Sequence, residues 1–128
     1  MSLFVDSLTS SLLLKSLEFC LEKQKVIANN IANAGVSNYK AMKIDDRTFV
    51  NLMDKIYESD NANSEKQKLT SNINVPNTLS ILNTESSVIL DYEMMELSKN
   101  TLQYQSLLAL KKGHSDIMYS AIKDGKSA

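Results

Sequence analysis

The spacing of apolar side chains in two segments at the ends of this 128-residue chain is the strongest constraint on its fold. Between residues 6 and 35 apolar side chains recur in steps of three and four, interrupted only at Gln24, and the series runs Leu13, Leu17, Cys20, Ile27, Ile31 and Ala34. Such steps place side chains on one face of an α-helix and are typical of a coiled-coil seam. A long helix with this stripe needs a packing partner, because propensity alone does not keep it folded in water.

A second stripe runs through residues 88–123. It is formed first by Leu90, Met94, Leu97, Tyr104 and Leu108, with Thr101 between them, and then drifts to Leu107, Leu110, His114, Ile117 and Ala121. The simplest solution is that the two long helices pair antiparallel as a coiled-coil-like hairpin. We therefore predict an all-α fold. One hairpin leaves part of each stripe exposed, and exposed stripes mark interfaces. The expected seam residues are Leu13, Leu17, Ile27, Met94, Leu97, Tyr104 and Leu108.

The segment between the stripes predicts less regular structure. Gly35 is placed to end the first helix in the left-handed conformation. Residues 36–57 are interpreted as a turn and a short helix capped by Asp45 or Asp46. Residues 58–83 are rich in Asn, Ser, Lys and Gln and predict a polar, partly disordered loop. With one core at most in a chain of this length, residues 1–128 are expected to form one domain.

Composition excludes several functional classes. The net charge is −1 and no Lys/Arg run is present, so the basic face that nucleic-acid binding requires is missing. No apolar run approaches the ~20 residues of a membrane span, and no cleavable secretory signal is recognised at the N-terminus. A single cysteine, Cys20, forms no internal disulfide.

The residues that carry catalysis or bind metals are too few for a site. His114 is the only histidine, and a metal site or a general base needs further ligands or an orienting acid around it. The three glycines form no phosphate-binding loop. We therefore expect no enzyme activity, no cofactor and no metal.

The end of the first helix contains a motif that its own stability does not require, Asn29, Asn30, Ile31, Ala32, Asn33 and Ala34, followed after a turn by Tyr39 and Lys40. Asparagine is a poor helix former because its side chain competes for backbone hydrogen bonds. One interpretation is a frayed helix end with fortuitous asparagines. The other is that these side chains bond to neighbouring subunits and hold helix ends in register, while the alanines allow close approach.

This motif, completed by Ala41, resembles the N-terminal signature of the flagellar rod and hook axial proteins. Residues 88–97, 100–105 and 120–122 resemble the C-terminal helix of the proximal-rod branch, so that the resemblance covers residues 8–57 and 84–123. The family commonly has glycine where Asn38 stands here. The resemblance implies a structural subunit of the hollow proximal rod that crosses the periplasm in the flagellar basal body. Its implied partners are copies of itself, other rod proteins and the flagellar type III export apparatus.

An alternative function remains open, that of a generic helical coiled-coil adaptor or secretion-needle-like subunit. Such a protein shares the helical hairpin but does not need the asparagine cluster or Tyr39 and Lys40. Replacement of Asn29, Asn30 and Asn33 by alanine separates the two, since a generic coiled coil tolerates it and a rod subunit loses assembly.

Overall fold

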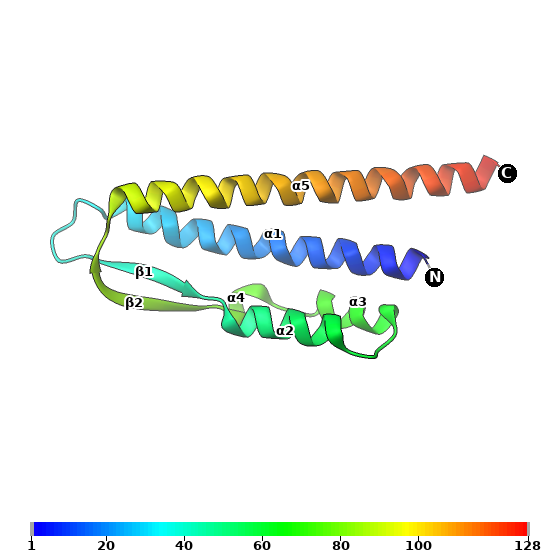
Figure 1. Ribbon diagram of the computed structural model, residues 1–128, viewed down its shortest axis with the longest axis horizontal. Coiled ribbons are helices and arrows are strands. Elements are labelled where there is room, and N and C mark those ends of the chain that lie inside the picture. The colour runs from blue at the N-terminus through cyan, green and yellow to red at the C-terminus, as the bar shows by residue number, and fades with distance from the viewer. Residues whose placement is uncertain (1, 128) are drawn as a thin grey trace.

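Two long helices at the ends of the chain dominate the structure, a computed structural model that describes residues 2–127, with side chains described for residues 8–125 (Figure 1). Helix α1 spans Ser2–Ala32 and helix α5 spans Leu90–Ser127. Between them lie β1 (Lys40–Asp45), α2 (Arg47–Glu58), α3 (Asn63–Ser71), α4 (Val75–Thr78) and β2 (Ser80–Ser87). The prediction of a mostly helical chain with long N- and C-terminal helices is confirmed.

Helices α1 and α5 lie side by side and run in opposite directions (Figure 1). Near the start of α1, the Ser10 hydroxyl accepts a hydrogen bond from Lys111 Nζ at 3.3 Å. Further along, Asn100 Nδ2 donates to the carbonyl oxygen of Cys20 at 2.9 Å. Residues later in α1 thus contact residues earlier in α5, as an antiparallel pair requires. The two helices keep the same register between these two contacts.

The face that α5 turns toward α1 is not the stripe expected from hydrophobicity. Its buried or half-buried positions follow a heptad spacing through Glu93, Leu97, Asn100, Tyr104, Leu107, Lys111, His114 and Met118. Leu97 and Tyr104 agree with the expected seam, whereas Met94 and Leu108 are 49% and 43% exposed. At Met94 and Leu108 the expected line lies one position away from the inner line, which contains Glu93 and Leu107 instead. Leu107 and His114, to which the stripe was expected to drift, lie on the inner line. Leu17 and Ile27 of α1 are buried as expected, and Leu13 is half-buried.

A two-stranded antiparallel ribbon corrects the all-α class. Strand β1 pairs with β2, with Ile44 opposite Ile81 and an irregularity between Lys40 and Met42. The segment interpreted as turn and helix, residues 36–57, therefore contains a strand first, and α2 begins only at Arg47. Local apolar spacing did not predict this because a strand pair depends on a partner about 40 residues away.

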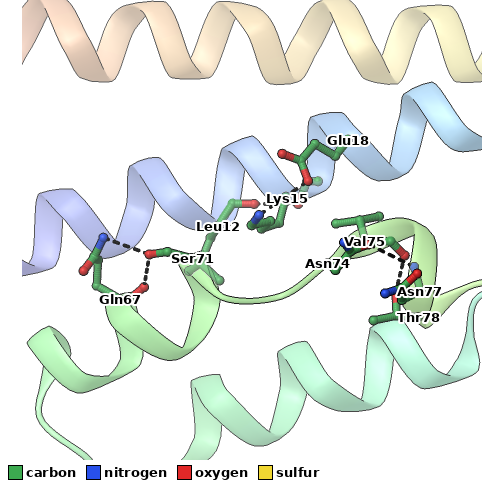
Figure 2. A network of polar contacts seen from close by, with 10 residues as sticks. Leu12, Lys15, Glu18, Gln67, Ser71, Asn74, Val75, Asn77 and Thr78 are labelled. Carbon is green, nitrogen blue, oxygen red and sulfur yellow. Dashed lines mark hydrogen bonds and ion pairs between the residues drawn. The ribbon is translucent and has the colours of Figure 1, made fainter.

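Residues 58–83 are also not the structureless loop that their composition predicts. Helix α3 packs against α1, and Thr70 and Val75 are completely buried. Figure 2 shows this contact, with Gln67 and Ser71 of α3, the turn Asn74–Thr78 and Leu12 and Lys15 of α1. Gln67 Nε2 donates to the Ser11 hydroxyl at 3.4 Å, and Thr78 Oγ1 donates to the carbonyl of Val75 at 2.7 Å. Burial of a few side chains of this segment against α1 is enough to order a stretch that is polar on average.

The turn after α1 uses a different residue from the one expected. Gly35 does not adopt a positive φ, whereas Asn38 does, with φ of 65°. Asparagine tolerates this left-handed conformation because its short polar side chain can bond locally. Asn38 thus supplies the left-handed conformation that was expected of Gly35.

We expect the two positions to respond oppositely to substitution. Asn38→Val lowers the free energy of unfolding by about 1–2 kcal/mol, because a β-branched side chain is strained in the left-handed region. Asn38→Gly is close to neutral. Gly35→Ala raises stability by up to about 1 kcal/mol, since a Cβ there meets no described atom within 4 Å. Thermal unfolding followed by circular dichroism measures both effects. Loss of stability in Gly35→Ala would contradict this account of the turn.

None of the helices in the described part of the chain is long and apolar enough to span a membrane.

Candidate assembly surface

Asn30, near the end of α1, is the centre of the predicted motif and is only 1% exposed. Its Nδ2 donates to the carbonyl oxygen of Met42 at 2.8 Å, and its Oδ1 accepts from the Met42 N–H at 2.8 Å. The Asn30 side chain thus satisfies both the N–H and the C=O of Met42. In an antiparallel strand the N–H and C=O of a residue point to the same side, so the amide of Asn30 stands where a third strand would pair with β1.

Tyr39 joins the other asparagines to this contact. Its hydroxyl accepts from Asn29 Nδ2 at 3.0 Å and donates to Asn30 Oδ1 at 3.4 Å. Asn33 Nδ2 in turn donates to the carbonyl oxygen of Asn29 at 2.8 Å and to its Oδ1 at 3.2 Å. The three asparagines and Tyr39 form one network that ties the end of α1 to the chain that follows it.

This geometry gives Asn30 a role that neither interpretation of the motif included, a frayed helix end or a contact to a neighbouring subunit. The side chain is buried, and it makes hydrogen bonds to Met42 and Tyr39 of its own chain. The remaining motif positions are more accessible. Asn29, Ala32 and Lys40 are exposed, and Ile31, Asn33, Ala34 and Tyr39 are half-buried.

A second buried asparagine was missed by sequence reasoning. Asn100 is 2% exposed, and its Nδ2 donates to Gln24 Oε1 at 2.9 Å as well as to the carbonyl of Cys20. Its Oδ1 is buried and has no partner among the described residues. Gln24 was visible as the single break in the apolar series of α1, and that break is the signal that could have indicated a polar partner on α5. A buried polar pair of this kind specifies register at a cost in stability.

Cys20 lies beside this pair and is 1% exposed. Burial raises the pKa of the Cys20 thiol, while the charge of Lys23 has a smaller, opposite effect. The thiolate is therefore disfavoured, and Cys20 acts as a small packing residue. Among the described residues, no group of three or more His, Cys, Asp or Glu side chains is arranged to hold a metal ion.

The start of α2 is held by Asp45. Asp46 directly precedes the helix but makes no capping hydrogen bond with its side chain. Asp45 Oδ1 instead accepts from the Arg47 N–H at 3.1 Å and from Arg47 Nε at 2.9 Å, and Oδ2 pairs with Nη2 at 2.7 Å. The hydrogen bonds from the Arg47 side chain, followed by the one from its backbone, lower the pKa of Asp45 from an ordinary 3.8 to about 2.

This pKa has a consequence for the dependence of stability on pH. A carboxyl group whose pKa is lowered by folding stabilises the native state above its ordinary pKa. The contribution of Asp45 is therefore complete above about pH 4 and is lost as the pH falls toward about 2. Carboxyl ¹³C titration by NMR is expected to give a pKa of about 2 for Asp45, and Arg47→Gln to raise it. A value near 3.8 in the unmodified protein would contradict the ion pair.

Comparison with known proteins decides the family. A family model described as "Flagella basal body rod protein" matches residues 21–40, which contain the asparagine network and Tyr39. The chain is 32% identical over 112 residues to the flagellar basal body rod protein FlgB of Bacillus subtilis (strain 168), covering 81% of this chain and 84% of that protein. This chain belongs to the flagellar basal body rod protein family. No solved structure gives a significant match.

Membership of the family confirms the resemblance to the FlgB-type rod proteins and the expected location. The chain is a structural subunit of the flagellar rod and is located in the basal body. A generic helical adaptor shares the long helices but does not account for the match over most of the chain. The segment that the family model matches is the one in which Asn30 joins α1 to β1.

Proposed function

We propose that this rod protein is a subunit of the proximal rod and that it assembles through its terminal helices into the hollow drive shaft. The observation that supports this most is the exposure of large apolar side chains along α5. Met94, Leu102, Leu108 and Leu110 are between 43% and 64% exposed, although each is a large apolar side chain on a helix of 38 residues. An exposed apolar surface of this kind marks a protein interface.

The total surface area supports the same conclusion. The accessible surface is 8605 Å², against ~6,800 Å² for a compact monomer of this mass. The excess of about 1,800 Å² exceeds the ~800 Å² that each partner buries in an interface of standard size. The elongated shape in Figure 1 leaves this surface along the sides of the helices, where neighbouring copies or other rod proteins can cover it.

The predicted seam residues divide between two kinds of contact in this proposal. Leu17, Ile27, Leu97 and Tyr104 stabilise the coiled-coil-like antiparallel pair of α1 and α5 within one subunit. Met94 and Leu108, on the outer line, pack against the helices of neighbouring subunits. From the motif, Asn29, Ala32, Ala34 and Lys40 are accessible enough to contact a neighbour, whereas Asn30 shapes the subunit itself.

The resemblance that first indicated the family also supports a route to the rod. We propose that the chain is exported by the flagellar type III apparatus, and that its role is structural rather than enzymatic. Folding of the chain does not depend on oxidation, because Cys20 is a buried free thiol. This is compatible with passage through an export channel. Contacts in a helical rod are head-to-tail rather than two-fold, and such contacts propagate.

Deletion and complementation test the proposal. Cells without this protein are expected to lack rods and to be non-motile, and the wild-type gene restores both. A Met94→Asp, Leu108→Asp double variant is expected to be exported but not to restore rods, because two charges would be buried in the interface. Glu85→Ala and Glu58→Ala, at exposed positions outside α5, are matched controls. Normal swimming of the deletion strain would refute the rod function.

A further inference from the structure

The two outer edges of the β-ribbon differ in whether their backbone groups are paired. Strand β1 lies between α1 and β2 (Figure 1), and Asn30 closes its outer edge by bonding to both the N–H and the C=O of Met42. Met42 stands opposite Asn83 of β2. Two opposite residues of an antiparallel pair either bond to each other or both point their backbone groups outward. The N–H and C=O of Asn83 therefore point away from β1.

The same alternation applies one step further along β2. Lys43 and Leu82 form the hydrogen-bonded pair, and Ile44 and Ile81 again point their backbone groups outward. Within the described part of the chain, the N–H and C=O of Ile81 and Asn83 have no hydrogen-bond partner. The side chain of Ile81 is 58% exposed and that of Leu82 is 44% exposed. The outer edge of β2 is thus open along residues 81–83.

The side chains of β2 do little to protect this edge. Proteins commonly guard an open edge with lysine, proline or a bulge. Residues 80–87 contain no Lys, Arg or Pro, and Glu85 is their only charge. An irregularity follows Asn83, where Thr84 Oγ1 donates to the carbonyl of Ala41 at 2.7 Å and accepts from the Ser86 N–H at 3.3 Å. The open edge is therefore short and uncharged, and it can serve as a template for another strand.

A second copy of this chain offers one matching edge. Its β1 is closed by Asn30, so β2 has the only open strand edge among the residues that the structure describes. Strand pairing between copies therefore joins β2 to β2, and in the antiparallel arrangement it is two-fold. With the axis at Leu82, Ile81 of each copy faces Asn83 of the other, and their outward N–H and C=O groups bond to each other. No like charges stand opposite each other at these positions.

We propose that the free subunit pairs with a second copy through the open edge of β2, so that the two ribbons form one continuous sheet. A two-stranded ribbon is marginally stable alone, and further strands stabilise it. The contact uses the open edge of both copies and therefore closes, whereas the contacts of a helical rod propagate. It involves neither α1 nor α5. The dimer is a state of the subunit before assembly, and it does not rest on the proposed rod function.

Cross-linking of single-cysteine variants tests the contact. In a Cys20→Ala background, Leu82→Cys places the two thiols opposite each other at the axis, where Cα atoms lie ~4.5 Å apart and a disulfide can form. Ser80→Cys, at an exposed position of the same strand, is the matched control, because its two thiols would lie ~13 Å apart along the strand. Mild oxidation is expected to give at least about tenfold more linked dimer with Leu82→Cys than with Ser80→Cys. Equal yields would overturn the proposal, as would absence of the Leu82→Cys dimer at protein concentrations up to about 1 mM.

Charge pairs test which residues face each other. The double variant Ile81→Lys, Asn83→Lys sets lysine against lysine across the axis, whereas Ile81→Lys, Asn83→Glu sets lysine against glutamate. Because like charges directly opposite destabilise a strand pair and opposite charges stabilise it, the Kd of the dimer is expected to be about tenfold higher in the first variant. Sedimentation measures the Kd, and circular dichroism checks that both variants are folded alike. The same Kd in both variants would refute the pairing of Ile81 with Asn83.

Complementation separates the dimer from the rod. Cells with Ile81→Lys, Asn83→Lys are expected to build rods and swim, because the edge belongs to the free subunit. If this variant is exported but builds no rods, the edge is a rod contact and the two-fold dimer is wrong. If the deletion strain itself swims, the rod function fails, and the cross-linking result still decides the dimer.

Discussion

Asn30→Ala is expected to release β1 from α1 and to prevent assembly of the rod. The substitution removes the amide that satisfies both the N–H and the carbonyl of Met42, each at 2.8 Å, and the acceptor of the Tyr39 hydroxyl. A backbone group left without a partner away from water costs about 1–3 kcal/mol, so the loss for the two groups of Met42 is up to about 6 kcal/mol. Hydrogen exchange is expected to show faster exchange of the Met42 amide and of the β-ribbon, and electron microscopy to show basal bodies without rods.

Asn33→Ala is the matched control for this prediction. Asn33 lies three residues away, directly after the end of α1, and its side-chain amide bonds only to Asn29. Asn29 is exposed, so water can replace these bonds and the change in stability is expected to stay within about 0.5 kcal/mol. Of the three alanine substitutions at Asn29, Asn30 and Asn33, only the one at Asn30 is therefore expected to disrupt the subunit. The other two test contacts to neighbouring subunits. Unchanged protection of Met42 in Asn30→Ala would show that the amide does not hold the strand.

Val75→Asp is expected to detach α3 and α4 from α1. Val75 is completely buried, and a carboxylate in its place would be buried without a partner, which costs at least about 3 kcal/mol. The long helix pair is held by separate contacts, among them the bonds of Asn100 to α1. We expect limited proteolysis to cut within residues 58–83 while most helical signal in circular dichroism is retained.

Leu69→Asp is the control for this second prediction, since Leu69 belongs to the same segment but is 39% exposed. It is expected to leave the protease pattern close to that of the wild type. If residues 58–83 of the unmodified protein were cut as rapidly as in Val75→Asp, the segment would be a disordered loop after all, as its composition predicts.

Buried polar residues explain why the sequence did not predict which face of α5 is turned inward. Asn30 and Asn100 are both nearly inaccessible to solvent, and both bond to backbone groups of a distant element. A hydrophobicity pattern treats such residues as surface, which is why the seam of α5 was placed on the line of Met94 and Leu108. The true inner line contains Glu93, Asn100 and Lys111, and Met94 and Leu108 lie outside it. That misplaced stripe is the surface now proposed for contacts between subunits.

By itself the sequence determined the two long helices, their need for a partner and the family, because helical periodicity and a short motif are local properties of the chain. Only the tertiary structure decided the strand at Lys40–Asp45, the docking of Thr70 and Val75 on α1, the face that α5 turns inward and the intrachain role of Asn30. Each of these depends on a partner in another element of the fold. A strand forms where its backbone N–H and C=O groups have hydrogen-bond partners on neighbouring elements. A polar segment becomes ordered where a neighbouring helix buries its few apolar side chains.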